Sequence, residues 1–202
     1  LEPGDMLYLP PQIAHDGVAV DACFTYSIGF RAPAYDELKS RFLAYLDDAI
    51  QIDGIYRDPD LEPVSHPGLI DHAMVARVAR TLSKISWNRQ TIVDFLGRYL
   101  TEPKLQVVFE RPPAIGFVRF AATARRTGVK LSLASQLLLH RHRGFINGES
   151  FALSGLHRDA IMSLADRRRL EPEKLSIAHH TLQILYGWYL AGYIRFMARG
   201  PT

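Results

Sequence analysis

The hydrophobic positions of the chain follow different periods along its 202 residues. Up to about residue 32, apolar residues form short runs interrupted by glycine and proline, a pattern that predicts β-strands. From there to about residue 100, apolar residues recur every three or four positions, which is the period of amphipathic helices. Further along, the two periods alternate. The sequence therefore predicts an α+β protein in three parts, at 1–33, 34–111 and 112–202.

The first part, residues 1–33, is expected to supply the last strands of a larger β-sandwich or barrel. Three strands leave unpaired edges and an uncovered apolar face, so they need further strands to pair with. The chain opens with Leu1 and Glu2, without an initiator methionine or the basic and apolar regions of a signal peptide. We therefore expect the remaining strands to lie upstream. The predicted strands of this part are 6–9, 17–20 and 22–30.

The second part, residues 34–111, has the pattern of amphipathic helices interrupted by a proline-rich loop at 51–67. Pro103 is expected to end the last helix, because proline lacks the amide hydrogen that a helix interior needs. The apolar faces of these helices need a partner, and a second copy of the chain would provide one. This part is therefore predicted to be a helical dimerisation region. Its predicted helices contain residues 38–49, 74–85 and 92–100.

The third part, residues 112–202, is predicted to be a small winged-helix-like domain. Gly128 is expected to end its first helix in a left-handed conformation. The pair Asn147 and Gly148, between two apolar runs, is a strong signal for a two-residue β-hairpin turn. Ser154 is expected to cap the helix that follows. In order, the predicted elements are a helix at 116–126, strands within 131–139, the hairpin, helices through 161–164 and 182–189, and a strand at 193–196.

Composition narrows the class of protein. No apolar stretch approaches the roughly 20 residues needed to cross a bilayer, so we expect no membrane span. The 24 Lys and Arg residues against 21 Asp and Glu give a net charge of +3, which by itself is too small to indicate nucleic-acid binding. The single cysteine, Cys23, excludes an internal disulfide and suits a reducing, cytoplasmic compartment. Its apolar neighbours predict that it is a small core residue.

Two basic clusters, at 140–143 and 167–169, raise the question of nucleic-acid binding, because winged helices are often nucleic-acid modules. Acidic residues lie close to both clusters, and no exposed aromatic residues are interleaved to form a stacking platform. A solvated face is therefore the favoured interpretation, and nucleic acid is not an expected partner.

The clearest chemical pattern lies at the start of the chain. Gly4 is expected to turn the chain into a strand, Pro10 to end that strand and His15 to enter the next one. This layout would aim an imidazole into the mouth of a barrel. An imidazole binds Fe(II) through one neutral nitrogen, and two further ligands complete a facial triad with open positions for oxygen and substrate. His15 is therefore the candidate metal ligand, and we expect it to face a concave β-surface.

The spacing of Gly4, Pro10 and His15 resembles the second motif of the cupins, in which this histidine binds the metal. Gln12 departs from the cupin pattern, which usually has glycine at that position, so the turn before His15 is expected to differ in detail. The run 15–17, followed by 25–33 and an amphipathic helix, resembles more narrowly the bacterial JmjC-type ribosomal oxygenases. The order of the three predicted parts is similar to that family as well.

The resemblance implies an Fe(II)- and 2-oxoglutarate-dependent oxygenase that hydroxylates a ribosomal protein side chain, an arginine in this family. His15 would be the distal histidine of an HxD/E…H triad whose other two ligands lie upstream, and Ser27 would lie near the 2-oxoglutarate. The implied fold is the terminal strands of a JmjC double-stranded β-helix, a helical dimerisation region and a C-terminal winged helix, assembled as a homodimer. With one of three metal ligands, the 202-residue chain alone is expected to be inactive.

Two alternatives remain open at this point. The chain could be a non-enzymatic winged-helix and dimerisation module that binds nucleic acid or a ribosomal protein. It could also derive from a different cupin, such as a sugar isomerase, although such an enzyme would not be expected to carry these helical extensions. His140 and His142 would imitate a metal-binding pair on one face of a strand, but they stand beside the hairpin and after the cupin-like motif, so a structural role is favoured.

Overall fold

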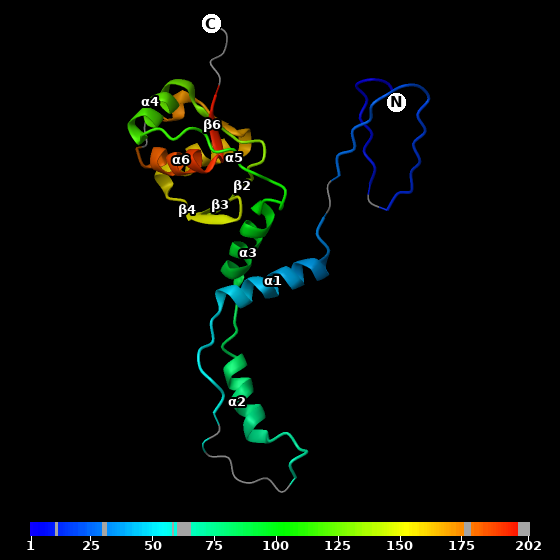
Figure 1. Ribbon diagram of the computed structural model, residues 1–202, viewed down its shortest axis with the longest axis vertical. Coiled ribbons are helices and arrows are strands. Elements are labelled where there is room, and N and C mark those ends of the chain that lie inside the picture. Colours follow the sequence, from blue (N-terminus) through cyan, green and yellow to red (C-terminus); the bar gives the residue numbers. More distant parts are fainter. Residues whose placement is uncertain (11, 30–31, 58, 60–65, 176–178, 198–202) are drawn as a thin grey trace. The chain divides into compact units, whose positions relative to one another are not determined.

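The computed structural model describes residues 1–10, 12–29, 32–57, 59, 66–175 and 179–197. The chain divides into two units, residues 1–40 and residues 41–202 (Figure 1). The described residues contain both helices and strands, so the α+β class predicted from the hydrophobic pattern is confirmed.

The first unit is an extended chain with turns, and its described residues form no strand before the helix that begins at Tyr35. The predicted strands at 6–9, 17–20 and 22–29 are therefore wrong for this chain; Phe30 lies outside the described residues. The backbone hydrogen bonds of this segment are local ones, such as that from the Asp5 amide to the Glu2 carbonyl at 3.0 Å. A strand is held by hydrogen bonds to neighbouring strands, and these residues make no such ladder here.

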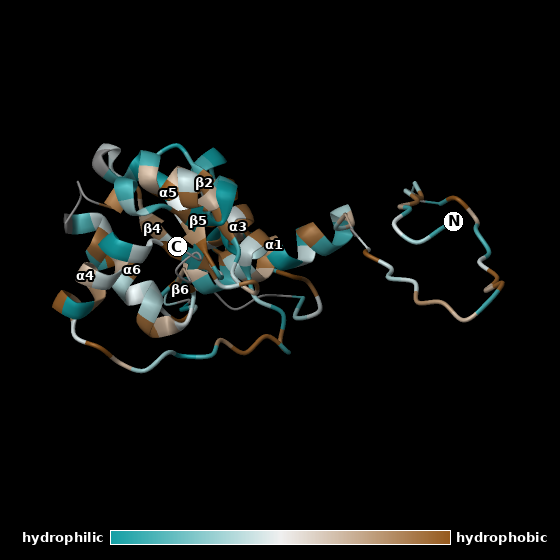
Figure 2. Cartoon of the chain, turned by 90° about the horizontal axis from the view of Figure 1, so that it is seen from above, coloured by the Kyte–Doolittle hydropathy of each residue, from teal (hydrophilic) through white to brown (hydrophobic). Residues whose placement is uncertain are grey.

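The side chains of this segment are exposed, including large apolar ones. Phe24 is 96% exposed and Met6 is 93% exposed. Figure 2 shows hydrophobic residues at several places along this segment, and their side chains are exposed. Apolar side chains in such numbers are normally buried, because each Å² of apolar surface that stays in contact with water costs about 25 cal/mol. The segment thus keeps the hydrophobic pattern of core strands without their packing.

Three helices follow at the positions that the apolar period predicts. Helix α1 spans Tyr35–Ala49, α2 spans His72–Leu82 and α3 spans Arg89–Thr101. Asn88 begins α3 with a capping box, in which its side chain accepts from the Thr91 amide and the Thr91 side chain accepts from the Asn88 amide. The helix ends at Thr101, two residues before Pro103, as predicted from the missing proline donor.

Aromatic side chains join the C-terminal half of α1 to α3. The Phe42 ring lies 5.2 Å from the Phe95 ring and 5.7 Å from that of Trp87, both edge-on. Tyr45 and Tyr99 extend the cluster on either side of Phe95, at 5.8 and 5.6 Å. Such pairs contribute about 0.5–1.5 kcal/mol each beyond the apolar area that they bury. This cluster explains why Phe95 is only 5% exposed.

The described residues of the C-terminal part form three α-helices and two small antiparallel sheets. One sheet has the strand order β5-β1-β6 and the other the order β2-β3-β4. Helix α4 precedes the first strand, whereas α5, a short 3-10 helix and α6 lie between later strands in the sequence. The bounds are α4 Phe117–Thr127, β1 Val129–Leu131, β2 Leu137–His140, β3 Arg143–Ile146, β4 Glu149–Ala152, α5 Gly155–Arg167, β5 Arg169–Leu170, η1 Pro172–Leu175, α6 His179–Ala191 and β6 Ile194–Phe196.

The turns of this part follow the predicted chemistry with two differences. Asn147 and Gly148 join β3 to β4 with positive φ angles of 49° and 85°, as a type I′ turn requires. Gly128 ends α4 with φ 72° but ψ 179°, so its backbone is not in the left-handed helical conformation that was predicted. Ser154 precedes α5 at the cap position, yet its side chain makes no capping hydrogen bond.

The core of the chain lies in this C-terminal part. Phe120 of α4, Ile161 and Leu164 of α5 and Leu182 and Leu185 of α6 are each fully buried. The inward residues of β1, β5 and β6 close the core from the other side. Because most of the fully buried large residues belong to this cluster, it provides the main hydrophobic stabilisation of the chain.

Close packing requires one glycine where helix α3 meets the sheet β2-β3-β4 and a second one within that sheet. A Cβ atom added to Gly97 of α3 would overlap the ring of Phe145 in β3. Likewise, a Cβ on Gly144 would overlap the ring of Phe151 in β4. The helix and the hairpin therefore form one packed body, in which the backbone of α3 lies directly against an aromatic ring.

Candidate functional site

His15 and Ser27, the candidate metal ligand and cosubstrate residue, are both exposed in the first unit. Nδ1 of His15 lies 3.1 Å from the carbonyl oxygen of Ile13, a local contact within the same segment. His15 does not face a concave β-surface, contrary to our expectation, because the segment forms no sheet. Cys23 is exposed too, so its assignment as a core residue is wrong.

Among the described residues, no group of three or more His, Cys, Asp or Glu side chains could hold a metal ion. His140 ends β2, whereas Arg141 and His142 form the turn into β3, so the two histidines do not share one strand. His180 stands beside His157 rather than in a ligand set, with ring centroids 4.7 Å apart. Of the three ligands of the predicted facial triad, the described residues therefore provide one candidate, His15.

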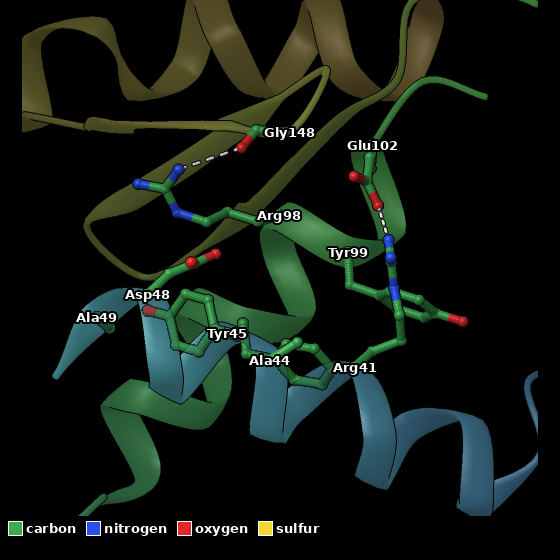
Figure 3. Close-up of a pocket in the computed structure, with 10 residues that line it drawn as sticks. Arg41, Ala44, Tyr45, Asp48, Ala49, Arg98, Tyr99, Glu102 and Gly148 are labelled. Carbon is green, nitrogen blue, oxygen red and sulfur yellow. Dashed lines mark hydrogen bonds and ion pairs between the residues drawn. The ribbon is translucent and has the colours of Figure 1, made fainter. Parts of the chain in front are cut away.

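An open cavity of about 500 Å³ lies between α1 and α3, next to the hairpin turn. Figure 3 shows Tyr45 and Asp48 on the α1 side and Tyr99 on the α3 side. Arg41 of α1 pairs with Glu102 across this cavity, and its guanidinium carbon lies 5.7 Å from the centre of the Tyr99 ring. The cavity therefore combines aromatic walls with four charged residues, two of which form this ion pair.

Arg98 connects this cavity to the hairpin. Its guanidinium donates to the Gly148 carbonyl at 3.3 Å (Figure 3). It also donates to the Ser150 hydroxyl at 2.8 Å. One turn earlier in α3, Asp94 lies 2.8 Å from Nε of Arg143, an ion pair without the alignment of a hydrogen bond. These contacts fix the position of the hairpin on α3. Their role is structural, and the guanidinium of Arg98 is already hydrogen-bonded within the chain.

A buried polar network at the hairpin turn was missed by the reasoning from sequence. Asn147 accepts from the Gln136 amide at 2.9 Å and donates to the Ser135 hydroxyl at 3.2 Å. Ser135 in turn donates to the Tyr193 carbonyl at 2.9 Å. Buried polar groups need such partners, and a satisfied network favours one arrangement of the two sheets. The Asn-Gly signal predicted the turn but not the role of the asparagine side chain.

His157 at the start of α5 is a buried titratable group with a defined partner. It is 3% exposed, and its Nδ1 lies 3.0 Å from the hydroxyl of Thr181 in α6, which is 1% exposed. Burial, and secondarily the nearby His180, lower the pKa of His157 below its usual value of 6.5. The imidazole is therefore neutral in the folded chain near neutral pH. It joins α5 to α6 and touches none of the candidate site residues.

The described residues contain no helix that is long and apolar enough to span a membrane.

Comparisons with known proteins divide the chain in a similar way. Residues 1–38 match the JmjC domain model, and residues 84–195 match the model of the ROXA-like winged helix. The first match confirms that the N-terminal segment is part of a JmjC domain, and the second confirms the winged helix. The winged-helix model includes α3, which agrees with the packing of this helix on the hairpin. The boundaries at 33 and 111 remain predictions.

Two curated relatives are bacterial enzymes. The chain is 30% identical over 115 residues to the ribosomal protein uL16 3-hydroxylase of Escherichia coli, covering 56% of this chain and 31% of the relative. It is 43% identical over 61 residues to a probable ribosomal oxygenase of Haemophilus influenzae, covering 30% of this chain and 13% of the relative. Both names agree with the family that the motif at 1–33 resembles.

Solved structures share the fold. The ribosomal oxygenase YcfD of Escherichia coli superimposes with a TM-score of 0.63 at 23% identity, over 85% of this chain and 48% of that one. Its complex with cobalt and 2-oxoglutarate gives a TM-score of 0.62 at 22% identity, over 85% and 48%. The chain thus spans about half the length of the solved relatives that it matches. Because the winged-helix model alone matches more than half of the residues, the chain belongs to the ROXA-like winged-helix family and carries part of a JmjC domain before it.

Proposed function

We propose that the chain is the C-terminal portion of an Fe(II)- and 2-oxoglutarate-dependent oxygenase that hydroxylates an arginine side chain of a ribosomal protein. The observation that carries the proposal is the Gly4, Pro10 and His15 spacing inside a segment that matches the JmjC domain and continues into the winged helix. The names of the two curated relatives support the same class of reaction. A ribosomal substrate also supports a cytoplasmic location.

The described residues do not by themselves fit an iron site. His15 offers one neutral ligand, and one imidazole does not offset the hydration of a divalent ion. Iron would bring the oxidising chemistry only where two further ligands complete the triad. We therefore derive no catalytic step for this chain, and we expect the 202 residues alone to turn over no 2-oxoglutarate.

In the intact domain, His15 would be the distal metal ligand and Ser27 would lie near 2-oxoglutarate. In an extended strand, alternate side chains point to one face, which would place Thr25, Ser27 and Gly29 on the same side. A serine hydroxyl between two small neighbours can donate to a carboxylate oxygen of the cosubstrate without steric conflict. The role proposed for Ser27 is therefore to help to orient the cosubstrate.

The test uses a protein in which the preceding strands of the JmjC domain are joined to this sequence so that the domain is complete, supplied with Fe(II), 2-oxoglutarate and large-subunit ribosomal proteins. We expect succinate formation together with one added oxygen atom on an arginine, detected by mass spectrometry. His15→Ala should abolish both products, and Ser27→Ala should raise the KM for 2-oxoglutarate more than it lowers kcat. His66→Ala, at an exposed histidine outside the motif, is the matched control. Full activity of the His15→Ala protein would refute the proposal.

We also propose that the helical region pairs two copies of the chain. Its helices and the residues that join α2 to α3 expose large apolar side chains that the described residues leave uncovered. Large apolar side chains gathered on exposed surface are typical of protein interfaces. A partner helix would cover it, as homodimer interfaces bury apolar faces. The exposed residues are Leu43, Val75, Val78, Leu82, Ile85, Trp87 and Leu100.

A further inference from the structure

Three basic side chains form a row across the sheet β5-β1-β6. In the strand register, Lys130 of β1 lies directly opposite Arg169 of β5 on one side and Arg195 of β6 on the other. Opposed residues of antiparallel strands place their side chains on the same face of the sheet. The three cations therefore share one face. The sequence could not show this, because the residues are far apart along the chain.

The row lies on the outer face of the sheet. Lys130 is exposed, and the side chains of Arg169 and Arg195 are 63% and 47% exposed. Its neighbours along the strands point the opposite way into the core, where Val129, Leu170 and Ile194 are fully buried. The alternation of buried apolar and exposed basic residues is complete over these three strands.

Like charges placed directly opposite each other destabilise a sheet. Two glutamates compensate the ends of the row: Glu171 lies 3.1 Å from Arg169, and Glu110 lies 2.7 Å from Arg195. Lys130, in the centre, has no ion-pair partner among the residues that the structure describes. Exposed ion pairs such as the two at the ends are worth about 0–1 kcal/mol, so an incoming anion can replace them at small cost.

We propose that this face, Lys130, Arg169 and Arg195, binds the phosphate backbone of RNA. Neighbouring strands lie about 4.8 Å apart, so the row extends over roughly 10 Å in a line, which suits an extended polyanion better than a single small anion. Arg125 and Arg126 are exposed in the last turn of α4, which precedes β1 in the sequence. The proposal does not depend on the oxygenase activity.

An acidic peptide fits this face less well than RNA. Protein partners are held chiefly by Trp, Tyr and Arg side chains that fill well-packed, desolvated pockets in the centre of an interface. The outward positions of these three strands that face one another are all basic and exposed, and they include no aromatic residue. Phosphate contacts need only Lys and Arg, without base recognition. The face is therefore expected to bind RNA without marked sequence preference.

The experiment measures binding of the 202-residue chain to a fluorescein-labelled 20-nucleotide oligouridine by fluorescence anisotropy, between 50 and 200 mM salt. Each phosphate contact with a single strand contributes a slope of about −0.7 to the plot of log K against log salt concentration. We expect Lys130→Gln to weaken binding severalfold and to reduce that slope by about 0.7. Lys84→Gln, at an exposed lysine between α2 and α3, should change neither.

Removal of the competing carboxylate gives a second, opposite test. Glu110→Gln frees Arg195 and should strengthen binding about two- to fivefold, whereas Asp47→Asn, at an exposed site in α1, should not. These magnitudes are on the order of the energy of an exposed ion pair. Three results would each overturn the proposal: undetectable binding of the RNA, equal losses in the Lys130→Gln and Lys84→Gln proteins, or equally tight binding of a 20-residue polyglutamate peptide. Circular dichroism confirms that each variant folds.

Discussion

The hydroxyl oxygen of Thr101, at the end of α3, accepts a hydrogen bond from the amide of Gly148 at 3.0 Å, across 47 residues of sequence. Thr101 is fully buried, and its own hydroxyl hydrogen can go to the Gly97 carbonyl at 2.8 Å. One side chain thus ends a helix and holds a hairpin turn at the same time. Together with Arg98, which binds the carbonyl of the same glycine, it satisfies both backbone groups of Gly148.

Thr101→Val should therefore destabilise the chain although it preserves the shape of the side chain. The substitution leaves the Gly148 amide without its acceptor, which costs about 1–3 kcal/mol of unfolding free energy. Urea denaturation measures the loss. Thr101→Ser keeps the hydroxyl and should recover part of it. Thr127→Val, where the hydroxyl bonds only to nearby carbonyls at the end of α4, should cost less. Equal losses at both threonines would refute a special role for the contact with the turn.

Two helical glycines should respond oppositely to alanine. Gly97→Ala places a methyl group inside the ring of Phe145 and should cost about 1–3 kcal/mol or more, because neither helix nor sheet can yield without losing contacts. Gly187→Ala in α6 meets no atom within 4 Å and should stabilise the chain by about 0.5–1 kcal/mol through helix propensity. The midpoints of thermal unfolding should move in opposite directions. Similar shifts of one sign would show that α3 does not pack as described.

His157 should make stability fall as the solution becomes more acidic. Its pKa in the folded chain is lowered by burial first and by His180 second, so below the usual value of 6.5 the unfolded chain binds a proton that the folded chain does not. The contribution of the neutral imidazole is complete above that pH and is lost as the pH decreases toward the lowered pKa. Urea midpoints at pH 8.0, 6.5 and 5.5 should decrease in this order.

The histidine variant isolates this contribution. His157→Asn removes the titration while its side-chain amide can still bond to Thr181, so the decrease below pH 6.5 should become shallower. His140→Asn, at the exposed end of β2, should retain the pH profile of the unaltered chain. An unchanged profile in the His157→Asn protein would assign the acid sensitivity to other groups.

The proposed dimer should depend on the apolar faces of the helical region. Leu82 is 54% exposed at the end of α2, and Leu82→Glu would bring a charge into a helix pair that excludes water. We expect the mass measured by sedimentation equilibrium to change from dimer to monomer. Leu133→Glu alters an even more exposed leucine in the C-terminal part, at 96%, and should leave the dimer intact. A monomeric unaltered chain would contradict the proposal directly.

Metal binding should distinguish this chain from a complete JmjC domain. Isothermal titration calorimetry with Co(II) should give the same weak heats of binding for the unaltered chain and for His15→Ala. One exposed imidazole is not accompanied by the further metal ligands that tight binding needs. The protein with a complete domain should bind Co(II) tightly, and lose that binding with His15→Ala. Tight, His15-dependent binding by the 202-residue chain would show that the described residues hold a site after all.

Elements with strong local signals were predictable from the sequence. The helix α1 follows from its apolar period, α3 from its period and from Pro103, and the β3-β4 turn from Asn147-Gly148. These features depend on residues within one or two turns of each other. The order of the winged-helix elements could be inferred for the same reason.

Features that depend on distant partners were not predictable. The strands expected in residues 1–33 need neighbouring strands for their hydrogen bonds, and hydrophobic alternation alone does not provide them. His15 was found through its spacing to Gly4 and Pro10, but its surroundings in space could not be inferred from that spacing. The opposition of Lys130 to Arg169 and Arg195 depends on strand register, which no local signal in the sequence sets.

Arg168 adopts a left-handed backbone conformation, with φ 58°, and its guanidinium donates to the carbonyls of Ser132 at 2.8 Å and Ser135 at 3.0 Å. It thus holds the connection between β1 and β2 in place. Both hydrogen bonds come from one nitrogen, Nη2, of a guanidinium that is weakly hydrated and always charged. The three consecutive arginines 167–169 are therefore not equivalent. Arg168 is needed for folding, whereas a substitution of Arg167 or Arg169 would alter surface charge without breaking this contact.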